Sequence, residues 1–181
     1  MLEKSLFSYN FNDGECIEFR LLSSEDSIEE LTQLLNKSYK VLADMGLNYV
    51  AATQDQSVTL KRSNNAYKCY IGIYKNRIVS TISLYTPSSS DNSSWYNKKF
   101  VAKVGQFAVV PELQKYGIGS KMMDIAEEEA RGIMNVRELA LDTAETAHHL
   151  INYYKKRGYK YIETIKWDAV NYNSVVLSKS L

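Results

Sequence analysis

The chain has 181 residues, of which 45% are hydrophobic and 24% are charged, so it is long enough to bury a full core without disulfide or metal support. It is expected to form a single domain over residues 1–181, in which residues 1–14 are an N-terminal extension. With 22 basic and 21 acidic residues the formal net charge is only +1, which excludes a chain-wide field for binding a nucleic acid or an anionic membrane.

The N-terminal segment does not have the pattern of a secretory signal. Glu3 and Lys4 form a charge pair inside its apolar residues, and no continuous apolar core follows. No apolar run in the chain approaches the length of a membrane span. Two distant cysteines, Cys16 and Cys69, are typical of a reduced intracellular protein. These features predict a cytoplasmic protein that works without a membrane or a nucleic acid.

The first third of the chain is predicted to form a strand and two helices. Residues 16–22 alternate between apolar and polar side chains, as a strand does. Ser27 followed by Glu30 has the pattern of a capping box and predicts a helix that ends at Gly46. A second, weaker helical pattern covers residues 53–62.

A hairpin and a long loop follow. Two strands at residues 67–74 and 78–85 are joined by a short polar turn, which predicts a β-hairpin. Residues 86–99 are polar, contain Pro87 and several serines, and have few apolar side chains. We therefore expect this segment to be a loop and the most mobile part of the domain.

The last part of the chain alternates between strands and helices. The expected elements are a strand at 103–110, a helix at 117–131, a strand at 138–142, a helix at 145–157 that ends at Gly158, and strands at 159–167 and 172–181. No internal repeat or linker divides this order. It predicts one α/β domain, of the α+β kind, with a mixed sheet.

Residues 114–120 have the pattern of an anion-binding turn. Gly117 and Gly119 let the backbone turn tightly and approach a ligand, and the helix that follows directs its unpaired N–H groups and its dipole at that ligand. A plain strand–turn–helix joint with glycines that only ease packing is the alternative. The spacing after Gly117 does not fit a Walker loop, and Met122 stands where a dinucleotide fingerprint needs its third glycine.

The same segment resembles the pyrophosphate loop of the GNAT superfamily of acyl-CoA-dependent N-acyltransferases, whose pattern is Gln/Arg-x-x-Gly-x-Gly/Ala. It reads Gln-x-x-Gly-x-Gly at residues 114–119. A second family element, aromatic-Tyr-x-x-x-Gly-aromatic, reads Tyr-Tyr-x-x-x-Gly-Tyr at residues 153–159. The separation of the two motifs and the order of the elements from Cys16 onward are similar to those of the family. The resemblance implies a mixed, mostly antiparallel sheet of about seven strands with about four helices, in which two central parallel strands splay apart.

This resemblance also implies acetyl-CoA as the cofactor and no metal. The backbone N–H groups of the loop would bind its diphosphate; the residues concerned are Gln114, Lys115, Tyr116, Gly117, Ile118, Gly119 and Ser120. The pantetheine arm would pair with the strand edge at Phe107, Ala108 and Val109, where family members carry a bulge. The Val109 N–H would point at the thioester oxygen. The side chains of these strand residues are expected to be core.

Tyr154 is the expected catalytic residue, because the resemblance makes it the acid that protonates the departing thiolate. A phenol with a pKa of about 10 suits a leaving thiol of similar basicity. The alternative is a structural role, since Tyr154 continues a helical stripe with Ala147, Leu150 and Ile151. Many family members carry asparagine at the position of Ala147, so one polar contact of the family is missing.

The general base is left open by the sequence. The glutamate that some family members use would fall near Lys103, which is a cation and cannot fill that role. Asp142 follows a buried strand at the edge where α/β sheets bind ligands, and it could equally cap the next helix. Glu112 and a water relay are the other two candidates.

The acceptor pocket is expected to form from the first two helices and from the loop before residue 100. The aromatic and apolar candidates are Tyr39, Met45, Tyr49, Trp95 and Tyr96. Without an acidic or a basic cluster, the sequence does not identify the acceptor. We expect transfer of an acetyl group from acetyl-CoA to a primary amine of a small molecule. Acetylation of a protein or peptide amine, a non-catalytic acyl-CoA-binding module, and a homodimer are left open.

Overall fold

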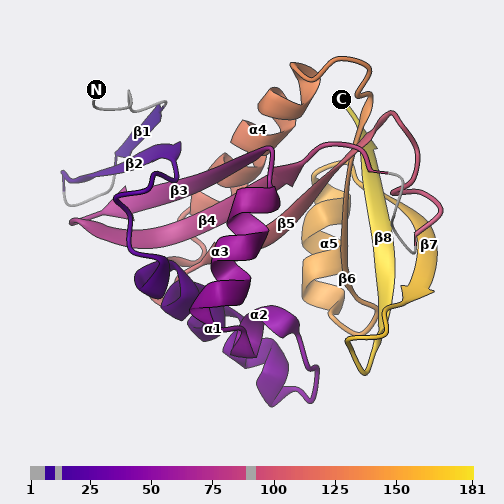
Figure 1. Ribbon diagram of the computed structural model, residues 1–181, viewed down its shortest axis with the longest axis horizontal. Helices are drawn as coiled ribbons and strands as arrows, with labels where there is room; N and C mark the ends of the chain where they lie inside the picture. Colours follow the sequence, from indigo (N-terminus) through magenta and orange to yellow (C-terminus); the bar gives the residue numbers. More distant parts are fainter. Residues whose placement is uncertain (1–6, 11–13, 89–92) are drawn as a thin grey trace.

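The computed structural model describes residues 7–10, 14–88 and 93–181. Eight strands form one sheet in the order β1-β2-β3-β4-β5-β6-β8-β7 (Figure 1). The strands are β1 (Phe7–Asn10), β2 (Cys16–Leu21), β3 (Lys68–Tyr74), β4 (Arg77–Tyr85), β5 (Val101–Val109), β6 (Glu138–Ala144), β7 (Lys160–Lys166) and β8 (Asn173–Ser180). The helices are α1 (Ile28–Asp44), α2 (Val50–Thr53), α3 (Gln56–Asn65), α4 (Ile118–Arg131) and α5 (His148–Lys156), and a 3-10 turn covers Pro111–Leu113.

Side-chain caps set where the first helices begin. The Ser27 hydroxyl accepts a hydrogen bond from the Glu30 N–H at 3.1 Å, and α1 starts there as expected. The single helix expected at residues 53–62 is two helices, α2 and α3. Gln54 has an extended backbone between them, and the Asp55 carboxylate caps a new helix by accepting from the Val58 N–H at 2.9 Å.

One pair of neighbouring strands is parallel. Strand β5 pairs with β6 at only three positions, which join Val101 to Glu138, Ala102 to Leu139 and Lys103 to Ala140. All other neighbours in the sheet are antiparallel. After Lys103 the two parallel strands diverge, and Figure 1 shows β5 continuing with β4 while β6 continues with β8. The expected mixed, mostly antiparallel sheet with splayed parallel strands is therefore confirmed.

A β-bulge interrupts β5 just where the splay opens. Ala108 is the partner of Thr81 and Gly105 is the partner of Ser83, so one residue of β4 lies opposite two residues of β5. Gln106, one of these two, has a left-handed backbone with φ of 47°. This conformation is uncommon for a residue other than glycine, and it redirects the second half of the strand.

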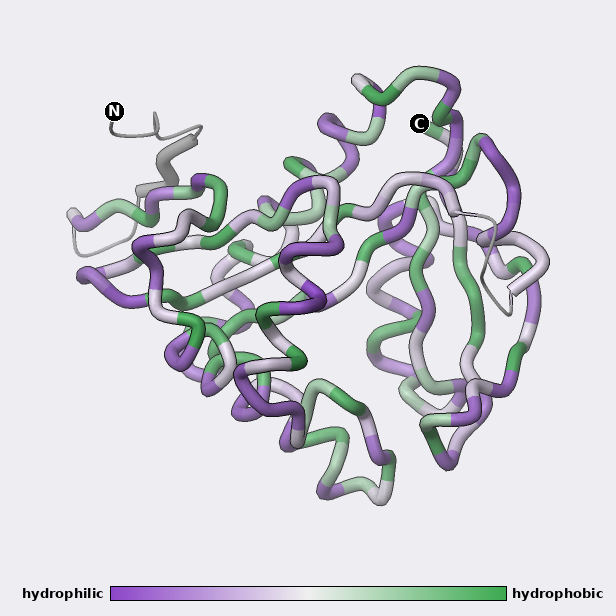
Figure 2. The backbone as a smooth tube through the Cα atoms, viewed as in Figure 1, coloured by the Kyte–Doolittle hydropathy of each residue, from purple (hydrophilic) through white to green (hydrophobic). Residues whose placement is uncertain are grey.

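Helices cover both faces of the sheet. On one face, Leu31, Leu34 and Leu35 of α1 pack against β3, β4 and β5. On the other face, the apolar side of α4 packs against the strands together with Tyr154 of α5. Figure 2 shows hydrophobic and hydrophilic residues alternating along α4, as expected for a helix with one buried side.

Two expectations concern segments that the structure describes only in part. The extension expected at residues 1–14 includes strand β1, which pairs antiparallel with β2, while residues 1–6 and 11–13 lie outside the described residues. In the loop expected at residues 86–99, residues 89–92 are likewise outside them, and Ser93 and Tyr96 are buried. Among the helices that the structure describes, none has the length and apolarity needed to cross a membrane.

Candidate functional site

The segment between β5 and α4 is fixed to the end of the strand by a glutamine side chain. Gln114 Nε2 donates to the Val109 carbonyl oxygen at 3.1 Å. The backbone N–H of Gln114 is already used, because it donates to the Pro111 carbonyl in the 3-10 turn at 3.3 Å. Gln114 was expected to offer its N–H group to a ligand. In the structure it holds the loop through its side chain instead.

The start of α4 presents unpaired backbone donors. Gly117 is the N-cap residue with φ of 83°, and Lys115 two residues earlier also has a left-handed backbone with φ of 69°. The first bond inside the helix runs from the Lys121 N–H to the Gly117 carbonyl. The N–H groups of residues 118–120 therefore have no partner within the helix and point out of its N-terminus. This geometry suits an anionic group.

Gly119 has a packing role as well. A Cβ atom built on Gly119 would lie 3.3 Å from Phe107 Cζ and 3.6 Å from Val109 Cγ2. A Cβ here would crowd the Phe107 ring, which would have to shift slightly, while Gly117 is needed for its backbone conformation. The two glycines of the motif serve different purposes: one lets α4 approach the strand, and the other forms the turn.

The free edge of β5 begins at the bulge. The Val110 N–H donates to the Val79 carbonyl and Ala108 pairs with Thr81, so these alternate residues face β4. By the alternation of a strand, Phe107 and Val109 direct their backbone groups to the opposite edge, from which β6 has diverged. Two hydroxyls of α1 donate to the carbonyl oxygens of these residues. The Tyr39 hydroxyl donates to the Phe107 carbonyl and the Ser38 hydroxyl to the Val109 carbonyl, each at 3.0 Å.

Tyr154 lies deep beside this edge. Tyr154 is only 7% exposed, and its ring packs with the rings of Tyr153 and Tyr159 at centroid distances of 5.2 Å and 5.9 Å. Burial raises the pKa of Tyr154 well above its ordinary value, so the hydroxyl stays protonated. Within the described part of the chain this hydroxyl has no hydrogen-bond partner. Ala147, the N-cap residue of α5, makes no side-chain cap.

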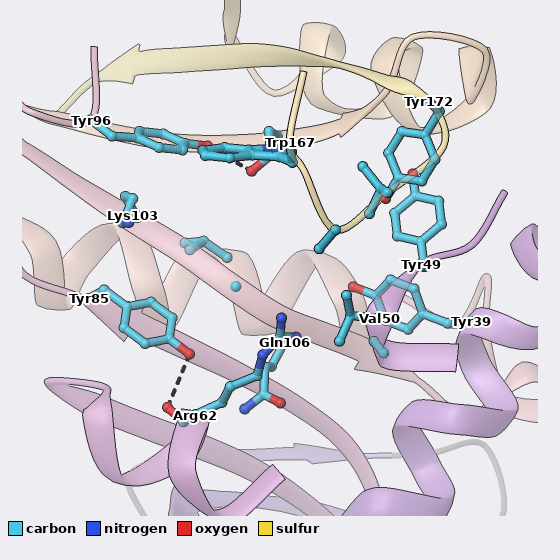
Figure 3. Close-up of a pocket in the computed structure, with 16 residues that line it drawn as sticks. Tyr39, Tyr49, Val50, Arg62, Tyr85, Tyr96, Lys103, Gln106, Trp167 and Tyr172 are labelled. Atoms are coloured by element: carbon cyan, nitrogen blue, oxygen red, sulfur yellow. Dashed lines mark hydrogen bonds between the residues drawn. The ribbon is translucent and has the colours of Figure 1, made fainter. Parts of the chain in front are cut away.

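A cavity of about 500 Å³ lies beside the first half of β5 (Figure 3). Its β5 wall is formed by residues 103–106, so the cavity ends at the bulge. The other lining residues come from helices, strands and loops far apart in the sequence: Tyr39, Tyr49, Val50, Ala51, Arg62, Tyr85, Tyr96, Asp142, Trp167, Ala169, Val170 and Tyr172.

One end of the cavity is aromatic. The ring of Tyr49 lies between those of Tyr39 and Tyr172, at centroid distances of 5.4 Å and 4.8 Å, and Figure 3 shows the three together. The Tyr49 hydroxyl bonds with Thr143 Oγ1 at 2.9 Å and accepts from the Ala144 N–H at 2.8 Å. Burial raises the pKa of all three tyrosines, which are therefore neutral wall residues at physiological pH.

The opposite end carries a carboxylate and a lysine that share one tyrosine. Asp142 accepts hydrogen bonds from the Tyr96 hydroxyl at 3.0 Å and from Trp167 Nε1 at 3.1 Å. The Lys103 ammonium lies 4.9 Å from the centre of the Tyr96 ring. Asp142 is thus held in the cavity wall just beyond the last parallel pair of β5 and β6.

Glu112, the other carboxylate considered for the base, is on the surface. It forms an ion pair with Lys37 and does not line the cavity. The hydrogen bond from Lys37 lowers the pKa of Glu112, which makes this carboxylate a weaker base.

The third charged residue of the cavity is Arg62. Its Nη1 donates to Gln54 Oε1 at 3.2 Å, and its carbonyl accepts from the Tyr85 hydroxyl at 3.1 Å. Gln54 in turn donates to Gln106 Oε1 at 2.9 Å, which connects the guanidinium to the bulge of β5. Sequence reasoning missed Arg62, because no local pattern distinguishes it from a surface arginine of a short helix.

The expected acceptor residues divide into two groups. Tyr39, Tyr49 and Tyr96 line the cavity. Met45 does not: it follows the last turn of α1 and is 55% exposed. Trp95 packs edge-on against Phe100, at a centroid distance of 5.8 Å, and lies outside the cavity lining.

Comparison with known proteins gives consistent matches. The model of the acetyltransferase (GNAT) family matches residues 28–159. The chain is 31% identical over 140 residues to S-(2-succino)cysteine N-acetyltransferase of Bacillus subtilis (strain 168), covering 76% of this chain and 81% of that protein. It is 28% identical over 145 residues to S-alkylcysteine N-acetyltransferase of the same organism, covering 78% of each.

Solved structures show the same fold. A GNAT family acetyltransferase from Elizabethkingia anophelis, solved with acetyl-CoA bound, matches with a TM-score of 0.62. It is 17% identical in sequence, and the match covers 91% of this chain and 98% of that one.

Proposed function

The chain belongs to the acetyltransferase (GNAT) family, and from that membership we propose that it transfers the acetyl group of acetyl-CoA to the α-amine of a small S-substituted cysteine. The observation that carries this proposal is the position of the cavity. Its wall on β5 ends at the bulge where the free strand edge begins. An acceptor in the cavity and a thioester on the edge would therefore meet at Gln106 and Phe107.

The acceptor class follows from the relatives and from the size of the cavity. Both relatives act, by their names, on the amine of a cysteine whose sulfur carries a substituent. A volume of about 500 Å³ is in the usual range for a small-molecule site. The mixture of aromatic walls with Asp142, Lys103 and Arg62 suits an amino acid, which has both polar ends and an apolar stem.

The residues present also fit acetyl-CoA. The N–H groups of residues 118–120, with the left-handed turn at Gly117, would hold its diphosphate, and the edge at Phe107 and Val109 would pair with the pantetheine arm. The adjoining loop residues 114–116 would close one side of this site. Ala108 faces β4 and contributes only by holding the edge in place. When bound, acetyl-CoA supplies an activated acyl carbon, to which the C–N bond forms as the C–S bond breaks.

Three groups of the chain would assist this transfer. The Val109 N–H would donate to the acyl oxygen and stabilise the negative charge that develops there. Tyr154, whose burial keeps it protonated, would give its proton to the departing sulfur. Asp142 would receive the proton of the amine, directly or through water, because it lines the cavity and Glu112 does not.

Incubation of the purified protein with acetyl-CoA and a panel of S-substituted cysteines tests the proposal. Release of the CoA thiol and mass spectrometry of the product should show N-acetylation of the cysteine derivative. Free cysteine, polyamines and lysine peptides serve as the comparison set. Transfer to peptides but to no cysteine derivative would contradict the acceptor class. Tight binding of acetyl-CoA by calorimetry, without transfer to any amine, would indicate a non-catalytic module.

A further inference from the structure

The charges in the acceptor cavity exceed what a simple amino acid needs. An amino acid offers one amine and one carboxylate at the end that reacts. Asp142 and Lys103 provide one anion and one cation there, and both contact Tyr96. Arg62 is a further cation on a different wall, bonded to Gln54 and Tyr85. Figure 3 shows Lys103 near Tyr96, and Arg62 beside Gln106.

Arg62 also lacks a carboxylate partner among the residues that the structure describes. Most other arginines of the chain have one, such as Arg20 with Asp26 at 2.7 Å and Arg131 with Glu128 at 2.8 Å. Arg137 also has none among the described residues, but it does not line the cavity. A guanidinium presents its donors in a planar fork that matches a carboxylate. An arginine that lines a cavity without a counter-ion is suited to bind an anionic group of a ligand.

The orientation of Arg62 is set by its neighbours. Gln54 is buried, and its Nε2 donates to Thr59 Oγ1 at 2.8 Å as well as to Gln106 Oε1 at 2.9 Å. Because both of its amide donors are used, its Oε1 must face the guanidinium of Arg62. One side of the arginine fork is thereby anchored, while the remaining donors are at the cavity wall.

We propose that Arg62 binds a carboxylate on the sulfur substituent of the acceptor, so that this protein prefers S-substituted cysteines with acidic substituents over neutral ones. The inference rests on the proposed function of the same cavity. Because the partner on its anchored side is a neutral amide, the charge of Arg62 complements a second carboxylate on the acceptor. A neutral substituent would desolvate the guanidinium without compensating it, which is why it is bound less well.

Two acceptors that differ only in charge test this directly: S-carboxymethylcysteine and S-carbamoylmethylcysteine. Their substituents have the same number of heavy atoms, and the second replaces the carboxylate by an amide. We expect kcat/KM of the wild-type protein to be about 10- to 100-fold higher for the acid, the usual effect of a hydrogen bond to a charged group. The difference should appear mainly in KM.

Variants of Arg62 test whether this residue causes the preference for the acidic acceptor. Arg62→Gln should reduce the ratio between the two acceptors to about threefold or less, and Arg62→Lys should give an intermediate ratio because it keeps the charge without the fork. Lys61→Gln is the matched control, since Lys61 is the exposed neighbour on α3 and does not line the cavity. It should leave the ratio unchanged. Thermal unfolding of each variant checks that the fold is retained.

Each result supports or overturns the inference. Equal kcat/KM for the two acceptors in the wild-type protein, or an unchanged ratio in Arg62→Gln, would overturn it while leaving the proposed function intact. No transfer to any S-substituted cysteine of the panel, in a protein that binds acetyl-CoA, would overturn the proposed function and this inference with it.

Discussion

The cofactor side and the acceptor side of the site share strand β5 but are assembled from different groups. On the cofactor side, the expected ligands are backbone N–H groups of one continuous segment, from the edge at Phe107 to the first turn of α4. On the acceptor side, the groups are side chains from separate elements, such as Tyr39 of α1, Arg62 of α3 and Asp142 of β6. A site made of contiguous backbone leaves a motif in the sequence, and a site made of dispersed side chains does not.

This difference implies that the two sides respond differently to mutation. Backbone donors can be altered only through the conformation of the chain, so glycine positions are the sensitive points of the cofactor side. Side-chain groups can be removed one at a time, so the acceptor side and the reacting centre can be tested by near-isosteric substitutions. Four predictions use this contrast.

The largest effect is expected at the point where the two sides meet. Tyr154→Phe keeps the ring that packs against Tyr159 and removes only the hydroxyl. If Tyr154 protonates the departing sulfur, kcat should fall by about 10²- to 10⁴-fold with acetyl-CoA affinity nearly unchanged. Steady-state kinetics and calorimetry measure the two quantities. Full turnover by the variant would assign Tyr154 a purely structural role.

The second effect separates the two carboxylates. Asp142→Asn keeps the size of the side chain and an acceptor for the Tyr96 hydroxyl, and it should lower kcat/KM by about 10²-fold if Asp142 receives the amine proton. Glu112→Gln should change kcat/KM by less than about twofold, because this residue is on the surface, pairs with Lys37 and does not line the cavity. A larger loss in Glu112→Gln than in Asp142→Asn would reverse the assignment.

The third effect concerns the cofactor side. Gly117→Ala forces a Cβ into a left-handed backbone, which costs about 1–2 kcal/mol, so the turn should shift and acetyl-CoA affinity should fall about tenfold. Gly46→Ala is the control, since Gly46 has the same φ of 83° and open space around it, outside the loop. Calorimetric affinities equal in the two variants would show that the turn at Gly117 does not form the diphosphate site.

The smallest effect is the absence of an alkaline limb in the pH profile. Burial raises the pKa of Tyr154 well above 10.0, so its proton is lost only at a higher pH than in a free phenol. Turnover should therefore hold its value as pH rises from about 8 to about 10, where the free phenol would begin to ionise. A fall of kcat in that range, present in the wild-type protein and absent in Tyr154→Phe, would mean that the hydroxyl ionises earlier than this burial allows.

Much of the fold could be predicted from the sequence, because periodicity and caps are local. Helix α1 starts after Ser27 as its capping box indicates, and the hairpin of β3 and β4 forms around the expected turn. Strand β1 was missed because four residues at the edge of a sheet carry too short a pattern. The break between α2 and α3 was also missed, although Asp55 offered a cap signal.

The site was predictable only in part, because its cofactor side is one continuous segment and its acceptor side is made of side chains far apart in the sequence. The turn at Gly117 and the position of Tyr154 could be predicted from two motifs. Arg62 and Trp167 could not, since they come to line one cavity with Asp142 only when the sheet has folded and β5 and β6 have diverged. The sequence contains no basic cluster, yet the fold brings Arg62 and Lys103 into one cavity.

A structure of the protein bound to CoA and to N-acetyl-S-carboxymethylcysteine would show whether both halves of the reaction are organised along strand β5. We expect the diphosphate at the N–H groups of residues 118–120 and the amino acid in the cavity beside Asp142. The acetyl group and the CoA sulfur should meet at the bulge of β5, near Val109 and Tyr154. A diphosphate bound elsewhere, or an amino acid outside this cavity, would contradict the claim that both halves of the reaction are organised along strand β5.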